Sequence, residues 1–412
     1  MTLQVRPVGT ELEHLRYLEL NTVAFGGVPS PPTVGDEELH GRLHDRSREF
    51  AALDGDRVVG GFYTYDLGLT LPGGAIVPAA GLAGVAVDGG SLGQGWLHRM
   101  LDAHLADARE RGEVVSLLTS SESGLYRRYG YGWATSYAVF EADAAESRLE
   151  HEVANGRLEL ITDPAEARSQ AAEAYRRVST VRSGTTSRSD AWWEVVYGPE
   201  RTWLGGGPQL TVIHRDTDGA PDGYLLYVAD LAGGGWHGVP GGTVQVRELL
   251  GASAEVELAL WDRATRVPLT RRVRWELAPV DSPVRWWMRD PRQLRTIAWR
   301  DMLWLRVLDV AALLEGRSYE VDGRVTFEVQ GPDDDPVSGT WTLAVSEGVG
   351  RVSRGGRPEV SLDLASLGSV ALGGIGMGEL SAAGRVTGDR VAVARMAALF
   401  RTAVQPFSLS RF

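Results

Sequence analysis

Residues 82–97 read LAGVAVDGGSLGQGWL, and this stretch indicates a strand, a glycine-rich loop and a helix in succession. Apolar residues dominate 82–87, as in a buried strand, and apolar positions recur at helical spacing over 96–108. A helix N-terminus exposes unpaired N–H groups, and glycines let a phosphate approach the backbone closely. The stretch therefore predicts either a pyrophosphate site or a plain turn whose glycines serve only its geometry.

The same loop contains a G-x-S-x-G match at residues 89–93, with Ser91 in the position of a hydrolase nucleophile. An α/β-hydrolase needs a backbone oxyanion loop before the serine and a series of parallel strands. Here the preceding residues 50–65 instead indicate an antiparallel hairpin around Asp54-Gly55-Asp56. The hydrolase interpretation is therefore the weaker one.

The rest of the chain predicts mixed helices and strands. Further helices are expected at 10–25, 36–46, 164–178 and 299–314. A strand is expected at 114–118, and further strands at 209–214, 223–230, 243–249 and 271–276. A β-meander is expected at 319–329, 339–345, 351–354 and 359–362, followed by helices. Its 412 residues suggest roughly two to four domains.

The composition excludes several chemistries. The chain has no cysteine, and all 42 of its basic residues are arginine. Thiolate nucleophiles, cysteine zinc sites, lysine Schiff bases and phosphate-loop lysines are thereby excluded. An acyl transfer must be direct or use an oxygen nucleophile.

The net charge of −12 argues against nucleic acid as a partner and suits cationic ligands. No apolar run approaches the length of a membrane span, and the first residues do not resemble a secretion signal. We therefore expect a cytoplasmic protein without a membrane partner.

Three other features are weak candidates for ligand sites. His40 and His44 are four residues apart and could face one metal, but no third ligand stands out. The glycine run at 373–378 lacks the spacing of a dinucleotide site and predicts a tight turn. Residues 333–335, three aspartates, are expected in a solvated turn. We expect no metal.

Residues 121–132 read SESGLYRRYGYG and carry the most specific motif. The Tyr126–Tyr131 segment fits Y-x-x-[FY]-G-[FY], and this pattern resembles the GNAT acyltransferase superfamily. Together with DMLWLRVLDV at 301–310 and the terminal Phe412, the chain resembles the enhanced intracellular survival (Eis) family of aminoglycoside N-acetyltransferases. The resemblance covers essentially the whole chain.

The resemblance implies a fold of the α+β / α/β class. An N-terminal GNAT acetyltransferase domain is expected at 1–150, a second GNAT-like domain at 151–295, and a sterol-carrier-like domain at 296–412. It also implies a homohexamer, with acetyl-CoA as co-substrate and a cationic amine such as an aminoglycoside as acceptor.

The resemblance also implies roles for individual residues. Tyr126 would be the general acid on the departing thiolate, and the carboxylate of Phe412 the general base on the amine. The pantetheine arm would pair with a strand, and the pyrophosphate would lie in the loop. The implied cofactor-binding residues are Val85, Ala86, Val87, Gly93, Gln94, Gly95, Trp96, Leu97, His98, Ser121 and Glu122.

One departure from the family concerns the loop. Relatives usually carry two or three consecutive arginines where this chain has Leu92, Gly93 and Gln94, and a proline where it has Asp88 or Gly89. Losing such contacts would cost roughly 1.5–3 kcal/mol each if they were well formed. The alternative to an active enzyme is therefore a catalytically impaired GNAT-fold protein that binds a ligand. A lipid carrier, suggested by the third domain alone, rests on fold analogy.

Overall fold

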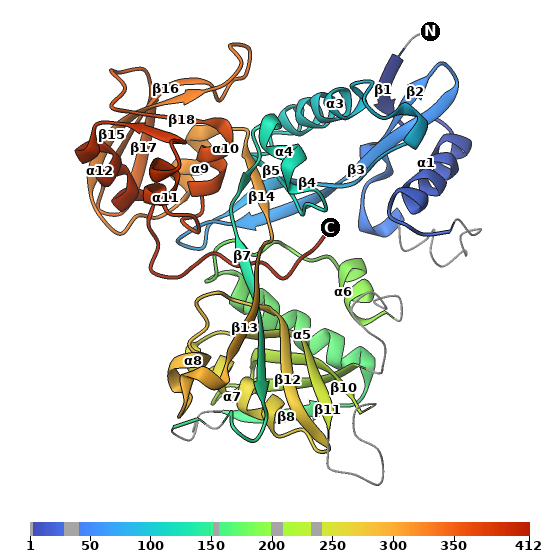
Figure 1. Ribbon diagram of the computed structural model, residues 1–412, viewed down its shortest axis with the longest axis vertical. Helices are drawn as coiled ribbons and strands as arrows, with labels where there is room; N and C mark the ends of the chain where they lie inside the picture. The colour runs from blue at the N-terminus through green and yellow to red at the C-terminus, as the bar shows by residue number, and fades with distance from the viewer. Residues whose placement is uncertain (1–2, 29–40, 148, 151–155, 199–208, 232–240) are drawn as a thin grey trace. The chain divides into compact units, whose positions relative to one another are not determined.

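The computed structural model describes residues 3–28, 41–147, 149–150, 156–198, 209–231 and 241–412 (Figure 1). They form two compact units. The first comprises Met1–Ala134, Leu303–Thr402 and Ser410–Phe412. The second comprises Thr135–Met302 and Ala403–Leu409. Within the described helices, none is long and apolar enough to cross a membrane.

The first unit contains a seven-stranded sheet with the strand order β1-β2-β3-β4-β5-β14-β6. Its strands are β1 (Leu3–Pro7), β2 (Glu49–Asp54), β3 (Arg57–Thr70), β4 (Ile76–Val87), β5 (Val115–Leu118), β14 (Trp304–Val307) and β6 (Gly132–Trp133). Its helices are α1 (Glu11–Ala24), α3 (Trp96–Glu110) and the short α4 (Ser123–Tyr126). The predicted helix at 10–25, hairpin at 50–65 and strands at 82–87 and 114–118 are confirmed.

Helix α3 forms because its apolar residues make one stripe. Trp96, Met100 and Leu101 are buried on that stripe. They pack with Phe62 and Leu82 of the sheet in one apolar cluster. This packing fixes the direction of α3 along the sheet. The N-terminus of α3 therefore lies beside the end of β4 (Figure 1).

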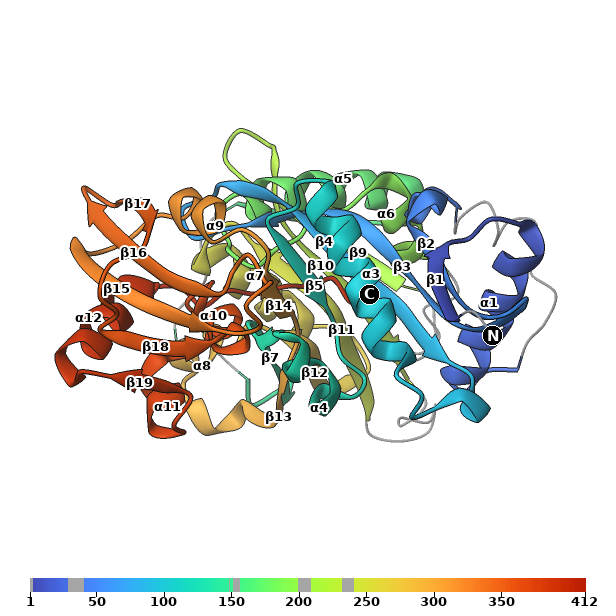
Figure 2. The ribbon, with the colours of Figure 1, turned by 90° about the horizontal axis from the view of Figure 1, so that it is seen from above.

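The same unit contains a five-stranded sheet with the order β17-β16-β15-β18-β19. The strands are β15 (Gly323–Gln330), β16 (Gly339–Ser346), β17 (Val349–Arg354), β18 (Val360–Asp363) and β19 (Val386–Gly388). The helices are α9 (Val310–Gly316), α10 (Leu364–Val370), α11 (Met377–Ala382) and α12 (Arg390–Phe400), the last lying against β15 (Figure 2). The predicted meander holds for β15 to β17, whereas β18 pairs with β15 in parallel.

The second unit is built on another seven-stranded sheet, with the order β13-β7-β12-β11-β10-β9-β8. Its strands are β7 (Ser136–Asp143), β8 (Arg157–Ile161), β9 (Gln209–Arg215), β10 (Pro221–Asp230), β11 (Gly242–Gly251), β12 (Thr270–Ala278) and β13 (Arg295–Asp301). Its helices are α5 (Pro164–Ser179), α6 (Asp190–Tyr197), α7 (Ala254–Thr265) and α8 (Val284–Trp287). Trp261 and Trp275 are fully buried in its core.

The predicted helix at 299–314 is wrong. Strand β13 ends at Asp301, β14 runs from Trp304 to Val307, and only α9 is helical. All four residues of β14 are buried, because this strand lies between β5 and β6 inside the sheet. A strand buried on both faces has no alternation of polar and apolar residues, so its sequence resembles a helix.

The sheets do not follow the predicted domain segments, because two strands belong to a sheet formed mainly by another segment. Strand β7, within residues 1–150, belongs to the second unit's sheet, and β14, within 296–412, belongs to the first unit's seven-stranded sheet. The domain boundaries at 150 and 295 stay predictions. The α+β / α/β class is confirmed, because each of the three sheets contains both parallel and antiparallel strand pairs and is accompanied by helices.

Candidate active site

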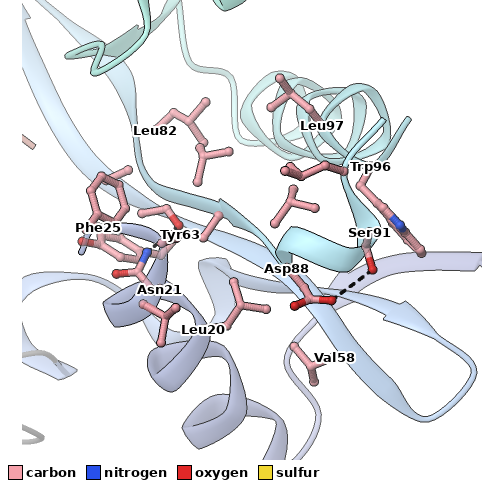
Figure 3. A pocket seen from close by; sticks show the side chains of 18 of the residues that line it. Leu20, Asn21, Phe25, Val58, Tyr63, Leu82, Asp88, Ser91, Trp96 and Leu97 are labelled. Carbon is pink, nitrogen blue, oxygen red and sulfur yellow. Dashed lines mark hydrogen bonds between the residues drawn. The ribbon is translucent and has the colours of Figure 1, made fainter. Parts of the chain in front are cut away.

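A large cleft of about 1940 Å³ lies in the first unit. Its walls come from α1, β4, the loop that follows β4 and the first turn of α3 (Figure 3). Residues of α4 also line it. The chain's last residue, Phe412, also lines it. The cleft therefore gathers the loop, the tyrosine motif and the terminus, which are far apart in sequence.

Strand β4 leaves one edge open toward the cleft. It pairs with β3 along its length, but with β5 only over Ala79–Gly81. A β-bulge interrupts the pairing with β3, and Gly84 at this point has a φ of +62°. The resemblance assigns residues 85–87 to the pantetheine arm. Val85 lies in the bulge, Ala86 and Val87 follow it, and all three line the cleft.

Helix α1 holds the bulge in place. The Tyr17 hydroxyl donates to the Gly84 carbonyl at 2.7 Å, and the Asn21 amide donates to the same oxygen at 2.8 Å. A Cβ atom at Gly84 would lie 2.4 Å from the Tyr17 hydroxyl oxygen, so a glycine is required there on steric grounds as well.

The loop after β4 presents an open helix N-terminus. Gly95 precedes α3 with a φ of 81° and gives the helix no side-chain cap. A Cβ atom at Gly89, Gly93 or Gly95 would meet nothing within 4 Å. The loop thus has room beside N–H groups that carry partial positive charge, which fits a phosphate-bearing ligand.

Ser91 does not have the surroundings of a hydrolase nucleophile. It is buried, in the short 3-10 helix Gly89–Ser91. Its hydroxyl accepts a hydrogen bond from Arg57 at 3.2 Å and donates to Asp88 at 3.4 Å (Figure 3). An arginine and an aspartate cannot serve as the neutral imidazole base that activates a serine.

Tyr126 lies at the end of α4 and lines the cleft. Burial, followed by the nearby Glu122 carboxylate, raises the pKa of Tyr126 to about 12. Its hydroxyl therefore stays protonated at neutral pH. Its ring meets the ring of Tyr131 edge-on, with 6.1 Å between centroids.

A buried polar chain supports this wall of the cleft. The Tyr131 and Ser116 hydroxyls lie 2.7 Å apart, and Ser116 lies 2.7 Å from His104 Nε2. The other ring nitrogen of His104 lies 3.0 Å from the Thr64 hydroxyl. Burial, with a smaller contribution from Arg48, lowers the pKa of His104 to about 3, so the ring stays neutral.

The side chain of Thr119 binds the chain terminus inside the cleft. The Phe412 N–H donates to the Thr119 hydroxyl at 3.2 Å, and that hydroxyl donates in turn to a terminal oxygen of Phe412. The Phe412 ring packs edge-on against Tyr65, with 5.8 Å between centroids. Thr119 thus forms hydrogen bonds with both the amide and the carboxylate of the last residue.

His44, one of the two histidines considered as metal ligands, has other contacts in the structure. His44 stacks on Tyr63 with 4.6 Å between ring centroids and lies 3.4 Å from buried Glu49, while His40 lies outside the described residues. His14 also bonds to Glu49, at 2.6 Å. Among the residues that the structure describes, no group of three histidine or acidic side chains could hold a metal ion.

Most of the predicted site residues meet in this one cleft. Val85, Ala86, Val87, Gly93, Gly95, Trp96, Leu97, His98, Ser121, Glu122, Tyr126 and Phe412 all line it. Gln94 is not among the lining residues, and its amide donates to the Gly90 carbonyl at 3.3 Å. Sequence reasoning missed Tyr17, Asn21 and Thr119, which hold the bulge and the terminus, and no local pattern marks them.

Comparison with known protein families gives three matches along the chain. Residues 4–134 match the family described as "Acetyltransferase (GNAT) domain", and residues 184–307 match a second family with the same description. Residues 310–408 match "Sterol carrier protein domain".

Relatives that align with most of the chain are also named as N-acetyltransferases. The chain is 33% identical to an uncharacterized N-acetyltransferase of Streptomyces coelicolor, over 93% of this chain and 94% of the relative. It is 30% identical to the N-acetyltransferase Eis of Mycobacterium tuberculosis, over 85% of each chain. The crystal structure of Eis1 from Mycobacterium abscessus superimposes with a TM-score of 0.86 and 28% identity, over all of both chains.

Proposed function

This chain belongs to the Eis family of N-acetyltransferases, and on that premise we propose that it acetylates amino groups of a cationic, aminoglycoside-like small molecule. The GNAT fold implies acetyl-CoA as the acetyl donor, and the chain is an acetyltransferase. We propose a direct transfer, with Phe412 as base and Tyr126 as acid. The observation that carries this proposal is the Phe412 carboxylate held by Thr119 in the cleft that Tyr126 also lines.

The base role rests on the terminal carboxylate. A substrate amine with a pKa near ~10 must lose a proton before its nitrogen can attack the thioester carbonyl. A carboxylate in water is a weak base for this task, so the proton would pass through a water or in a desolvated site. Phe412 would accept that proton, and the Thr119 hydrogen bonds orient its carboxylate.

The acid role of Tyr126 is best served by a hydrogen bond. When the C–S bond breaks, the thiolate that leaves has an ordinary thiol pKa near ~8.5. With the pKa of Tyr126 raised to about 12, complete proton transfer would be uphill by roughly 5 kcal/mol. The hydroxyl would therefore stabilise the developing charge on sulfur, and the released thiolate would afterwards take up a proton from water.

The cleft offers matching contacts for CoA. Acetyl-CoA supplies the acetyl group as a thioester. The open edge at Val85–Val87 suits the amides of the pantetheine arm, and the uncapped α3 N-terminus with its left-handed Gly93 and Gly95 suits the pyrophosphate. The space beside these glycines, which a Cβ atom would occupy, supports the fit.

The charge of the cleft supports a cationic acceptor. The acidic side chains that line it are Glu13, Glu19, Asp56, Asp88 and Glu122, against the arginines Arg16, Arg57 and Arg128. Arg6 lowers the pKa of Glu13 to about 2, which keeps this carboxylate charged. An excess of carboxylates attracts polycations and raises their local concentration.

The proposal is tested by release of free CoA thiol from acetyl-CoA with an aminoglycoside as acceptor. The matched control is the same aminoglycoside with all its amines already acetylated. We expect turnover that depends on free amino groups and rises with the number of positive charges on the acceptor. Equal thiol release with and without a cationic amine would contradict the proposed substrate class.

The homohexamer that the resemblance implies belongs to this proposal and is tested by sedimentation equilibrium.

A further inference from the structure

We propose that Arg57 binds a phosphate of CoA beside the loop in which this chain lacks the arginines of its relatives. The inference rests on the proposed function, because it concerns the same cleft. Arg57 is the first residue of β3 and follows the turn of the β2–β3 hairpin, so it reaches the loop from outside the β4–α3 segment.

The position of Arg57 brings its guanidinium to the loop. It lines the cleft together with Asp88, Gly93 and Gly95. One nitrogen donates to Ser91 in the loop at 3.2 Å. A cation from a neighbouring strand therefore lies next to the residues in which family members carry arginines.

Arg57 is free to change partners when a phosphate arrives. Its side chain is 63% exposed, and its distance to the half-exposed Asp88 carboxylate is 3.8 Å. Ion pairs of this kind stabilise a protein by about 1 kcal/mol at most. A phosphate offers a guanidinium two parallel charge-assisted hydrogen bonds, which are stronger than its present contacts.

The other arginines that line the cleft make their contacts away from the phosphate loop. Arg128 donates to the Leu125 carbonyl at 3.1 Å, and its guanidinium lies over the Tyr129 ring, 5.4 Å from the centroid. Arg16 pairs with Glu19 at 2.9 Å. Among the described residues that line the cleft, Arg57 is the arginine with a hydrogen bond to the phosphate loop.

Asp88 should have the opposite effect on CoA binding to that of Arg57. Its carboxylate lies beside Arg57 and Ser91 at the beginning of the loop (Figure 3). A carboxylate there repels a phosphate and competes for Arg57. Removing its charge should therefore strengthen CoA binding, whereas removing the charge of Arg57 should weaken it.

Calorimetric titration with CoA separates these effects. For R57Q we expect about a tenfold weaker Kd, the loss of one partly exposed charge-assisted contact. For D88N we expect about a threefold tighter Kd. The R57K variant should recover part of the loss. The matched control R99Q removes an exposed arginine of α3 outside the cleft lining and should change Kd less than about twofold.

A parallel titration with dephospho-CoA identifies the phosphate. If the effect of R57Q disappears with dephospho-CoA, Arg57 binds the 3′-phosphate; if it persists, Arg57 binds the pyrophosphate. Equal CoA affinity of R57Q and the wild-type protein would overturn the inference while the proposed function stands. Failure of the wild-type protein to bind CoA or acetyl-CoA would overturn the proposed function, and the inference with it.

Discussion

Each seven-stranded sheet contains a strand, a helix and a parallel strand in succession, yet the two connections differ. In the first unit β4 leads to α3, and β4 pairs in parallel with β5. In the second unit β11 leads to α7, and β11 pairs in parallel with β12. Both β4 and β11 carry a β-bulge in their antiparallel pairing. The element order is thus the same in both places.

The connections decide which helix N-terminus is open. Residues 88–95 separate β4 from α3, whereas only residues 252–253 separate β11 from α7. Ser253 caps α7, because its hydroxyl accepts from the Val256 N–H at 3.4 Å. A Cβ atom at Gly251 would lie 2.6 Å from the Glu257 nitrogen, so this turn is closely packed.

The two connections share the order of their elements but differ in whether the helix N-terminus is available to a ligand. A capped helix with a two-residue connection has its N–H groups satisfied by the chain, and it serves packing. An uncapped helix after a long glycine loop keeps those groups for a ligand. We therefore expect one acetyl-CoA site per chain, in the first unit, and variants in the two connections should behave differently.

The largest effect should come from lengthening the chain. Two glycines added after Phe412 move the terminal carboxylate away from Thr119, which now bonds to it. We expect kcat to fall by about 1000-fold, in the range of general-base catalysis. Initial rates at saturating acetyl-CoA and amine measure this effect.

The control for this extension is the Kd of acetyl-CoA. The extended protein should bind acetyl-CoA like the wild type, because the loop and the open edge of β4 are unchanged. An unchanged kcat would remove Phe412 from the mechanism.

The next largest effect should come from Tyr126→Phe. Without the hydroxyl the departing sulfur loses one hydrogen-bond donor, and kcat should fall by about 100-fold with a much smaller change in KM. Tyr129→Phe, a change in the same motif, is the matched control and should retain most of the activity. Equal kcat for wild type and Tyr126→Phe would contradict the acid role.

The pH dependence gives an independent check on Tyr126. Because burial raises its pKa to about 12, the protonated donor form persists to that pH. Between pH 7 and about 10.5, loss of the Tyr126 proton should therefore not lower kcat. Any fall of kcat in this range should be the same in the wild-type protein and in Tyr126→Phe. If kcat of the wild-type protein fell near pH 10 and kcat of Tyr126→Phe did not, Tyr126 would titrate like an ordinary, exposed tyrosine, which would contradict the raised pKa.

A smaller effect is expected from filling the open loop with Gly95→Asn. Asparagine tolerates the left-handed backbone of Gly95, and its Cβ meets nothing in the free protein. The side chain would, however, occupy the space proposed for the pyrophosphate. We expect KM for acetyl-CoA to rise about tenfold at similar thermal stability. An unchanged KM would argue against a phosphate at this helix.

The smallest effect should come from the closed connection. Ser253→Ala removes the cap of α7 and should lower the free energy of unfolding by about 1 kcal/mol, seen as a lower Tm. Neither kcat nor KM for acetyl-CoA should change. A raised KM would contradict the assignment of this connection to packing alone.

Local sequence patterns predicted much of this architecture. The glycine loop and the apolar stripe of α3 identified the strand, loop and helix, and the Tyr126 motif identified the family. Such signals work because one segment contains all the residues involved. Strand β14 was predicted as a helix, since its burial depends on β5 and β6, which lie far away in sequence.

The supporting residues of the site could not be predicted in the same way. Thr119 is an ordinary residue after a strand until the terminus, 293 positions away, bonds to it. Asp335 was expected in a solvated turn, but its side chain is only 9% exposed, and its carboxylate accepts from Arg109 at 2.9 Å and also from Arg306. Contacts of this kind join distant segments, and a single sequence carries no local signal for them.

The most direct measurement is a calorimetric titration of the wild-type protein with acetyl-CoA. The account predicts micromolar binding with one acetyl-CoA per chain, since only the first connection leaves a helix N-terminus open among the two compared. No binding at millimolar acetyl-CoA would favour an impaired GNAT-fold protein that binds another ligand. Two sites per chain would contradict the distinction between the open and the closed connection.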